Sequence, residues 1–341
     1  MSHRPGSIAT ARRAASLVLA ALVALCSVAS AQAWKPTRPA AFIVGAAPGG
    51  SIDLTARLIQ NIWSETRIVG TPVIVINKPG AGNGIAWEYL NERGADGHAI
   101  AIGTTNLVSN PVIGLHRIGW RDVTPLAMLF DDYMVLAVKS DSPLRSMRDV
   151  ADRLRKDPAA LSIAFAPGLG AGSHTAAAVA VKATGARVGD ARFVVYKSAG
   201  EALASMLGGE IDIVSATSAN IPPFLQSGRV RVLAVTAPQR LGGALAQVPT
   251  LKEQGFDAVF TNWRAVIGPK GMRREHVAFW EDALSRVTQS DAWRRELERN
   301  FWTANFVTGP AAREFMERSS NDFRELWASL GIKPRPAAPA R

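Results

Sequence analysis

The sequence predicts an α/β protein, and two observations lead to this fold class. Short, continuously apolar segments alternate along the chain with amphipathic stretches, and several of the apolar segments end in a glycine-rich turn. Continuously apolar strands separated by helices are typical of a parallel sheet that is covered on both faces. The length of 341 residues is about twice that of an ordinary domain, so we expect two such domains.

The expected elements follow in order along the chain. A first apolar strand at 41–44 precedes an amphipathic helix at 54–63, in which Leu54, Leu58 and Ile62 recur at helical spacing. Further strands are expected at 73–76, 99–102, 134–138, 161–165, 193–196, 211–214 and 230–235, and further helices at 85–93, 147–155, 174–184 and 199–207. From residue 280 we expect mostly helix, until a basic, disordered tail begins at residue 333. No low-complexity linker separates the first group of strands and helices, up to residue 102, from the second group, which begins at residue 134. This favours two domains joined by crossing strands.

Residues 1–33 have the features of a secretory signal peptide. Arg4, Arg12 and Arg13 precede an apolar run at 14–29, and small residues follow at 29–31 and 31–33. This combination is typical of a cleavable signal peptide. The apolar run is shorter than the roughly 20 residues that a transmembrane helix needs. We therefore expect cleavage after Ala33 and export of a soluble mature chain.

Charge and composition exclude several classes of function. The formal net charge is +11, but the basic residues are scattered and interleaved with acidic ones. We therefore expect weak attraction of small anions and no nucleic-acid partner. The single cysteine cannot form an internal disulfide, and no two of the five histidines stand at a helical metal-binding spacing. The sequence predicts neither a metal site nor a cofactor.

Two glycine-rich loops share one design, in which a strand ends, the chain turns at glycine and a helix begins near a serine. The first loop comprises 48–53 and the second comprises 168–175. Glycine lets the backbone approach a ligand closely, and the N–H groups and dipole of a helix start favour an anion. Ser51 and Ser173 are also expected to act as N-caps. Two such loops, one in each half of the chain, predict an anion site between them.

The sequence contains no convincing catalytic set. The glycine cluster at 80–84 resembles a dinucleotide-binding fingerprint only superficially, because its last glycine is misplaced and no acidic residue follows a strand at the right distance. Ser173 lacks the second glycine of a hydrolase elbow. The adjacent pair Asp131 and Asp132 is expected at a crossover, as solvated carboxylates. A binding protein is therefore expected, and a nucleotide-dependent secreted enzyme is a less favoured alternative.

A series of short segments carries a family resemblance. These segments are Ala-Pro-Gly-Gly-Ser-Ile-Asp-Leu-Thr-Ala-Arg at 47–57, Asn-Lys-Pro-Gly-Ala-Gly at 77–82, Gly-Ser-His at 172–174, Leu-Gly-Gly-Glu-Ile-Asp at 207–212, Leu-Ala-Val-Thr at 233–236 and Val-Pro-Thr at 248–250. They cover nearly all of the mature chain, in the order and with the spacing typical of one family. The chain resembles the tripartite tricarboxylate transporter substrate-binding proteins, also called Bug proteins.

The resemblance implies a periplasmic-binding-protein-like (type II) Venus flytrap, with a ligand cleft between two α/β domains. Domain 1 would comprise residues 34–130 and 233–341, and domain 2 residues 131–232. The protein would be a periplasmic monomer that captures a small carboxylate, either an organic acid or a carboxylated amino or aromatic acid, for membrane transporter subunits. A ligand-sensing adaptor for a membrane signalling protein is an alternative with the same cleft.

The resemblance also implies which residues bind the ligand, mainly through backbone N–H groups, hydroxyls and water. Carried onto this sequence, they are Pro48, Gly49, Gly50, Ser51, Asp53, Thr104, Thr105, Gly170, Gly172, Ser173 and His174. Asp53 is expected to organise its loop rather than to touch an anion, because two negative groups repel. The chain departs from the family pattern at Asn83, at Ser198 and at Ser215-Ala216-Thr217. The contacts at the distal end of the ligand therefore stay open, and Arg264 is either a cation there or a solvated side chain.

Overall fold

The computed structural model describes residues 34–329. The expected signal peptide and the expected basic tail from residue 333 lie outside these residues. A compact unit that begins at Lys35 contains the helices and strands described here. Within the described residues, no helix combines the length and the apolar character needed to cross a membrane.

The first part of the sheet is built from three parallel strands, β1 (Ala40–Val44), β2 (Val73–Asn77) and β3 (Ala99–Thr104), in the order β2-β1-β3. All five residues of β1 are buried, as its continuous apolar sequence predicts. The helices α2 (Ser51–Thr66), α3 (Gly84–Asn91) and α4 (Asn106–Ile113) follow these three strands in turn. The glycine-rich loop predicted in this half, at 48–53, therefore lies where the parallel strand β1 gives way to helix α2.

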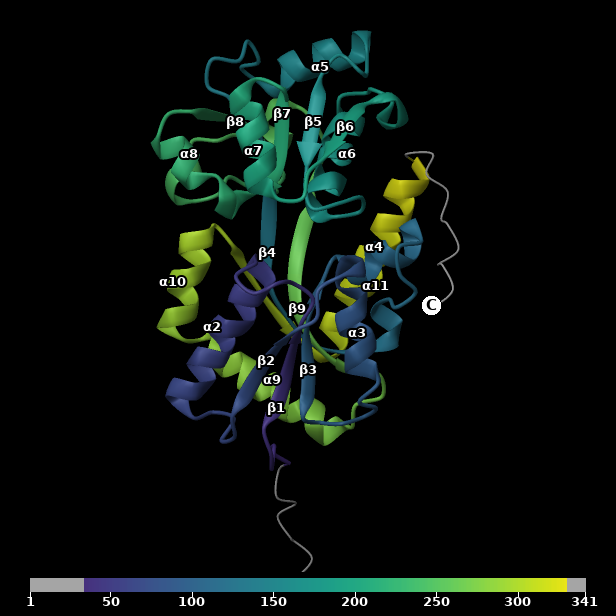
Figure 1. Ribbon diagram of the computed structural model, residues 1–341, viewed down its shortest axis with the longest axis vertical. Helices are drawn as coiled ribbons and strands as arrows, with labels where there is room; N and C mark the ends of the chain where they lie inside the picture. Colours follow the sequence, from purple (N-terminus) through teal and green to yellow (C-terminus); the bar gives the residue numbers. More distant parts are fainter. Residues whose placement is uncertain (1–33, 330–341) are drawn as a thin grey trace, which may run out of the picture. The chain divides into compact units, whose positions relative to one another are not determined.

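The centre of the sheet is a 17-residue strand, β4 (Val123–Lys139). Its first half pairs with β9 (Thr261–Pro269) and β10 (Thr303–Thr308), and its second half pairs with β7 (Ile213–Thr217) and β8 (Val230–Val235). All four pairings are antiparallel, as is the pairing of β3 with β9. The expectation of a purely parallel sheet was therefore wrong at its centre. Figure 1 shows β4 and β9 running through the middle of the molecule.

The second part of the sheet is again parallel, with β5 (Ser162–Phe165) between β6 (Arg192–Val195) and β7. It carries the helices α5 (Met147–Lys156), α6 (Gly172–Ala183), α7 (Ala199–Gly208) and α8 (Pro222–Gln226). The second glycine-rich loop leads from β5 into α6. It repeats the strand-to-helix geometry that leads from β1 into α2.

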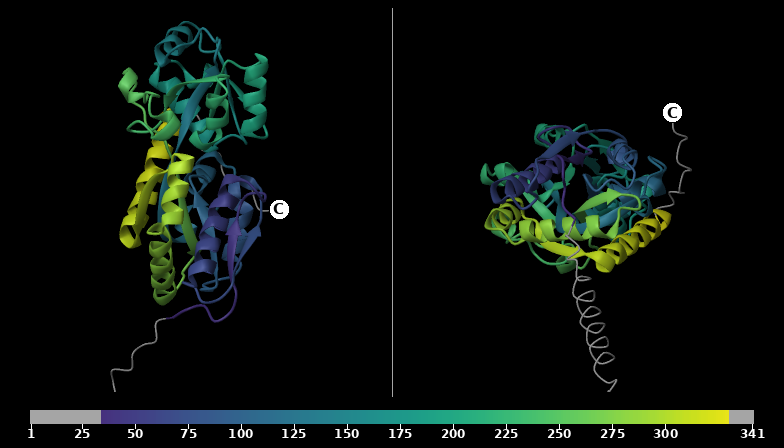
Figure 2. Two further views of the ribbon diagram at one scale, coloured as in Figure 1. Left: turned by 90° about the vertical axis from the view of Figure 1, so that its left-hand side faces the viewer. Right: turned by 90° about the horizontal axis from the view of Figure 1, so that it is seen from below.

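Three helices complete the described chain: α9 (Arg274–Thr288), α10 (Asp291–Asn300) and α11 (Gly309–Ser329). Helix α9 packs against α2 and α10 (Figure 2). The ring centroids of Trp63 of α2 and Trp280 of α9 lie 5.4 Å apart, with the ring planes tilted by 50°. Helix α11 packs on α4 and β4. Short 3-10 helices lie at Ala81–Asn83, Trp120–Asp122, Val188–Asp190, Ser218–Asn220, Gly243–Leu245 and Lys252–Gln254.

The order of strands and helices confirms the expected α/β class, but several elements were missed. Helix α4, strands β9 and β10 and the first half of β4 had not been expected. Strand β9 carries Asn262 and Arg264, and β4 carries Pro125 and the pair Asp131 and Asp132, so neither presents an unbroken apolar run. Asn262, Arg264 and Asp132 are buried, and Asp131 is half-buried.

Candidate functional site

The first loop is an exposed turn at the start of α2. Pro48, Gly49 and Ser51 are exposed, and Gly50 is half-buried. Gly49 has a φ of +81°, a left-handed conformation that favours glycine. The N-cap of α2 is Gly50, and Ser51 is the first residue of the helix, so the expectation that Ser51 is an N-cap was wrong. The first N–H groups of α2 have no partner within the helix, and groups of this kind can bind an anion.

Asp53 holds the first loop together. Its carboxylate accepts hydrogen bonds from the backbone N–H of Gly49 at 2.8 Å, from Nε of Arg57 at 2.8 Å and from Nδ2 of Asn77 at 2.8 Å. The side chain is fully buried. Burial raises the pKa of Asp53, but the hydrogen bonds from Arg57, Asn77 and Gly49 outweigh this effect and hold the pKa below its usual value. These contacts give Asp53 the loop-organising role that the sequence predicts.

The second loop is closed by Ser173. Helix α6 begins at Gly172, and its N-cap is Ala171, so the expectation that Ser173 is an N-cap was also wrong. The Ser173 hydroxyl donates to the carbonyl of Ala166 at 2.5 Å, back across the loop. Ser215 Oγ in turn donates to the carbonyl of Ser173 at 2.8 Å. Since the one hydroxyl proton of Ser173 is used inside the loop, its backbone N–H is the donor that remains for an anion.

His174 is directed into the protein. Its ring stacks on Phe165 with 4.3 Å between centroids and meets Phe193 and Trp327 at 5.4 Å each. Burial lowers the pKa of His174 to about 4, so the ring is neutral at pH 7. A neutral imidazole offers no charge to a carboxylate, and its Nδ1 already accepts a hydrogen bond from Gly170. His174 therefore shapes the second loop.

The glycines of the second loop permit close packing. A Cβ at Gly172 would lie 2.8 Å from Oδ1 of Asn262, and a Cβ at Gly170 would collide with the side chain of Ile113. Gly170 also has a φ of +74°. Ile113 belongs to α4 and Asn262 to β9, so the second loop packs against the helix that follows β3 and against a central strand.

A continuous chain of contacts joins the two loops. Asn83 packs over Gly45 at the base of the first loop, and its Nδ2 donates to Oγ1 of Thr104 at 3.1 Å. The neighbouring Thr105 donates through Oγ1 to Oδ1 of Asn262 at 2.9 Å. Asn262 in turn lies against Gly172 at the start of α6. Thr104, Thr105 and Gly172 are thus brought together around Asn262.

Asn83 and Asn262 had not been identified as site residues. Asn83 was noticed only as a departure from a family glycine. Its φ of +73° explains why either glycine or asparagine stands at this position, because asparagine tolerates the left-handed region better than most side chains. Asn262 stands beside Trp263 and Arg264. The sequence did contain a signal for Asn262, because polar residues on both sides of Trp263 predict a strand with one polar face.

A buried ion pair lies beside Asn262. Nδ2 of Asn262 donates to Oδ2 of Asp132 at 3.3 Å, and Nη2 of Arg264 lies 3.7 Å from the same oxygen. Asp132 is 2% exposed and Arg264 is 5% exposed. Burial raises the pKa of Asp132 to about 6, against the opposing effects of Arg264 and Asn262. The expectation that Asp131 and Asp132 are solvated was wrong, because Asp132 is buried and Asp131 is half-buried, with its Oδ2 accepting from Nδ2 of Asn305 at 3.0 Å. Burial raises the pKa of Asp131 to about 6 as well.

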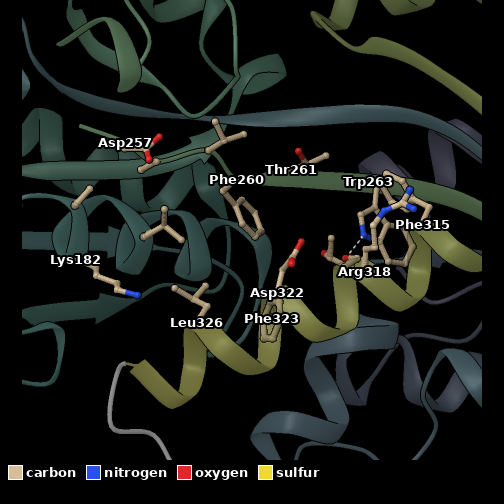
Figure 3. A pocket seen from close by; sticks show the side chains of 16 residues that line it. Lys182, Asp257, Phe260, Thr261, Trp263, Phe315, Arg318, Asp322, Phe323 and Leu326 are labelled. Carbon is tan, nitrogen blue, oxygen red and sulfur yellow. Dashed lines mark hydrogen bonds between the residues drawn. The ribbon is translucent and has the colours of Figure 1, made fainter. Parts of the chain in front are cut away.

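Two cavities of small-molecule size lie along α6 and reach α11. One has a volume of about 880 Å³ and is lined by His174, Gly168 and Trp327 among others. The other has a volume of about 660 Å³, and Figure 3 shows Phe260, Trp263 and Phe323 on its walls. His174 and Thr105 each reach one of the two cavities, but the first loop lines neither. Among residues 34–329, no group of three or more His, Cys, Asp or Glu side chains could hold a metal ion.

Comparison with known proteins gives the family. Residues 55–317 match the tripartite tricarboxylate transporter family receptor. Protein BugT of Bordetella pertussis is 28% identical over 312 residues, which cover 86% of this chain and 91% of BugT.

Solved structures share the fold. A TctC solute binding protein from Polaromonas is 27% identical, with a TM-score of 0.71, over 86% of this chain and 99% of that chain. An R. palustris protein with adipate is 24% identical, with a TM-score of 0.77, over 88% of this chain and 99% of that chain. These neighbours confirm the expected periplasmic-binding-protein-like fold. The family consists of receptors and binding proteins. This confirms the prediction of a binding protein rather than an enzyme. The chain belongs to the tripartite tricarboxylate transporter receptor family, as its sequence segments had indicated.

Proposed function

We propose that this chain is an exported receptor that binds a small carboxylate between its two glycine-rich loops and delivers it to a tripartite transporter in the membrane. The observation that carries the proposal is the paired arrangement of helix starts. Helix α2 has 16 residues and α6 has 12, each begins directly after a glycine-rich loop, and the chain of contacts through Asn262 joins the two loops. Helix starts bind anions through free N–H groups and the helix dipole.

The ligand class is supported by the loops and by a structural neighbour. The R. palustris protein, which has the same fold, was solved with adipate. In this chain the donors of each loop are mainly backbone N–H groups, and Arg57, a cation of α2, is already paired with Asp53. Such a set suits one carboxylate group, held by hydrogen bonds worth about 1.5–3 kcal/mol each. The proposed contacts are the N–H groups at 51–53 and 172–174 together with the hydroxyl of Ser51. The N–H of Gly49 and the hydroxyls of Thr104 and Thr105 already donate to Asp53, Asn106 and Asn262.

We propose that binding closes the protein about β4 and β9. The domains would be residues 34–130 with 233–341 on one side and 131–232 on the other. Strand β4 supports this division, because its first half pairs with β9 and β10 while its second half pairs with β7 and β8. Closure of two domains around a ligand is a common hinge motion.

The binding proposal is tested on purified mature protein with a series of mono-, di- and tricarboxylates, first by thermal shift and then by calorimetry. Ser51→Ala removes an exposed hydroxyl from the first loop, so affinity should fall several-fold while the melting temperature of the free protein changes little. Ser290→Ala is the matched control. Ser290 is the true N-cap of α10 and accepts from the N–H of Trp293 at 3.2 Å, so its loss should lower stability and leave affinity unchanged. Absence of binding to every carboxylate, with binding of a neutral sugar, would refute the proposal.

Export is tested separately. Fractionation of the producing cells should place the protein in the periplasm, and N-terminal sequencing should find a mature chain that begins within two residues of Trp34. A protein that keeps Met1 and stays in the cytoplasm would contradict this part of the proposal. Cross-linking in membranes that contain the transporter subunits, with a sensor kinase as the alternative target, distinguishes delivery from sensing.

A further inference from the structure

The 880 Å³ cavity beside α6 carries an inference that is separate from the carboxylate site. Its walls include parts of α4, the second loop, α6, β6 and α11, and the first loop takes no part in it. Among residues 34–329, no Lys, Arg, Asp or Glu side chain lines this cavity. Its larger apolar side chains are Ile113, Leu115, Leu169, Val188, Phe193 and Trp327. Such walls favour an uncharged molecule, because an ion placed there would lose its hydration without gaining a charged partner.

His174 supplies one hydrogen-bond donor to this cavity. Its Nδ1 accepts from the backbone N–H of Gly170, so the proton of the neutral ring is on Nε2. His174 is only 5% exposed and lines the cavity, yet Nε2 donates to no acceptor within residues 34–329. Nε1 of Trp327 also lacks a partner, but protein atoms cover it completely, and Nε2 of His174 is not covered in this way. A donor of this kind indicates a ligand that supplies the acceptor, since unpaired polar groups inside proteins are costly and rare.

The cavity reaches the protein surface beside two exposed leucines. Leu115 is 44% exposed and Leu169 is 64% exposed, and both line the cavity. The other polar side chain of the wall, Asn106, already accepts from Thr104 Oγ1 at 3.2 Å and donates to Asn110 Oδ1 at 3.3 Å. Apolar walls with few polar groups, at this volume, are typical of sites for small molecules.

We propose that this cavity is a second ligand site, which binds an uncharged, largely apolar molecule whose carbonyl group accepts a hydrogen bond from Nε2 of His174. The site goes beyond the proposed function, because the donors of the carboxylate site are the backbone N–H groups of the two helix starts. An occupant lies against Leu169 on the cavity side of the second loop and does not touch the first loop. The two ligands can therefore be bound at the same time.

The test compares three probes of one shape on the wild-type mature chain, by ligand-observed NMR titration. The first is 4-phenyl-2-butanone, the second is butylbenzene, which has a methylene in place of the carbonyl, and the third is 4-phenyl-2-butylamine, which has an ammonium group at that carbon. The ketone should bind about 3- to 10-fold more tightly than butylbenzene, because only the ketone accepts from His174. The amine should bind at least about tenfold more weakly than the ketone, because the cavity offers its charge no partner.

The titration with the ketone is then repeated in an excess of succinate and in an excess of adipate. Affinity for the ketone should be unchanged within about twofold, since the two sites use different groups. Displacement of the ketone by either acid would place the ketone in the carboxylate site and would overturn the proposal of a second site.

Two variants of α6 locate the site. Ala178 lies four residues after His174, on the same side of the helix, and lines the cavity, so Ala178→Leu should fill part of it and weaken ketone binding at least about tenfold. Ala183→Leu is the matched control, because it makes the same change on the same helix, but Ala183 lines the 660 Å³ cavity of Figure 3. This control should bind the ketone as wild type does.

His174→Phe tests the donor. Phenylalanine keeps an aromatic ring between Phe165 and Phe193 but has no N–H, so the advantage of the ketone over butylbenzene should shrink to less than about twofold. Butylbenzene itself should still bind. Melting temperatures show whether each free variant folds, and the comparison of probes on the wild-type chain needs no variant.

Several outcomes would overturn the second site. If neither the ketone nor butylbenzene binds, the cavity is closed or filled in solution and the proposal fails. Equal binding of the two, or an advantage of the ketone that persists in His174→Phe, refutes the role of His174. Unchanged binding in a folded Ala178→Leu refutes the location. These outcomes leave the proposed function standing, because that function depends on carboxylate binding, which is measured separately.

Discussion

Nδ1 of His174 accepts a hydrogen bond from the backbone N–H of Gly170 at 3.0 Å, so a side chain of the first turn of α6 holds the loop that precedes the helix. Acceptance at Nδ1 requires that this nitrogen be unprotonated. The neutral state of His174, which burial maintains, is therefore part of the structure of the loop.

His174 is expected to make stability depend on pH. Its pKa is about 4 in the folded protein and 6.5 ordinarily, so the unfolded chain binds more protons between these values. The contribution of His174 to stability is complete above pH 6.5 and is lost as pH falls through 4, a loss of about 3 kcal/mol. His174→Asn keeps an acceptor near Gly170 but does not titrate there. The free energy of unfolding, measured by urea between pH 4 and 7, should fall more steeply for wild type than for this variant.

The comparison with His174→Asn is needed because Asp131 and Asp132 act in the opposite direction. Their pKa values are raised to about 6, so the folded state binds more protons than the unfolded state, and their effect favours folding as pH falls from 6. Both carboxylates are present in the two proteins, so their effect cancels in the difference. Parallel curves for wild type and His174→Asn would contradict the burial of a neutral histidine.

The sequence predicts the outer elements of this fold well and its centre poorly, for a physical reason. Strands such as β1 are apolar throughout because both faces are covered, and α2 has one apolar face, so periodicity locates both. Strand β9 buries Asn262 and Arg264 against Thr105 and Asp132, partners that are distant in the sequence. A polar residue satisfied by such a partner cannot be distinguished in the sequence from a solvated one.

The sequence predicts where the loops of the candidate site lie, but not the roles of most of their side chains. The glycine-rich turns and the helix starts follow from local sequence, and so does the loop-organising role of Asp53. Ser51 and Ser173 follow the usual pattern of N-caps, yet α2 begins at Ser51 and α6 begins one residue before Ser173, so neither serine is the cap. The neutral state of His174 depends on Phe165, Phe193 and Trp327, which come from three separate elements.

Asp53→Asn is expected to loosen the first loop. An amide keeps one acceptor oxygen and loses the charge that binds Arg57 and the N–H of Gly49, and a hydrogen bond to a charged group is worth about 1.5–3 kcal/mol. The melting temperature should fall, and so should carboxylate affinity, since the N–H groups of the loop lose their orientation. Because the pKa of Asp53 is lowered in the folded state, its contribution is present above pH 3.8 and is lost as pH falls below that value.

Asp282→Asn on α9 is the matched control for Asp53. Asp282 pairs with Arg286 at 3.1 Å with the same spacing of four residues, but both side chains are more than half exposed. Exposed pairs of this kind contribute little to stability. Thermal unfolding should therefore show a clear shift for Asp53→Asn and almost none for Asp282→Asn. Equal shifts would mean that the contacts of Asp53 with Gly49 and Asn77 do not support the loop.

Ser173→Ala is expected to affect stability more than binding. The variant loses the hydrogen bond to the carbonyl of Ala166, at a cost of about 1 kcal/mol. Since the hydroxyl proton of Ser173 is already donated to Ala166, affinity for a carboxylate should change by less than about threefold. Ser198→Ala, which removes the true N-cap of α7, gives a similar loss of stability for comparison. A large loss of affinity in Ser173→Ala alone would show that the hydroxyl turns toward the ligand.

Gly172→Ala is expected to disrupt the junction between the second loop and β9. The added methyl would lie 2.8 Å from Oδ1 of Asn262 and 3.0 Å from Cε of Met134. Asn262 cannot move freely, because it holds Thr105 and Asp132, so we expect a loss of about 1–3 kcal/mol in urea unfolding. Gly168→Ala in the same loop is the control, since a Cβ there meets no atom within 4 Å and its φ is not positive.

A double-mutant cycle assigns the cost of Gly172→Ala to Asn262. Asn262→Ala alone removes the hydrogen bonds to Thr105 and Asp132 and should destabilise the protein by itself. In that background the methyl at position 172 loses its main obstacle, so Gly172→Ala should cost at least 1 kcal/mol less than in wild type, a coupling of the size found for residues in contact. Additive costs would mean that the two residues do not touch in solution. The start of α6 would then be free of β9, and the chain of contacts that joins the two loops would be broken at this point.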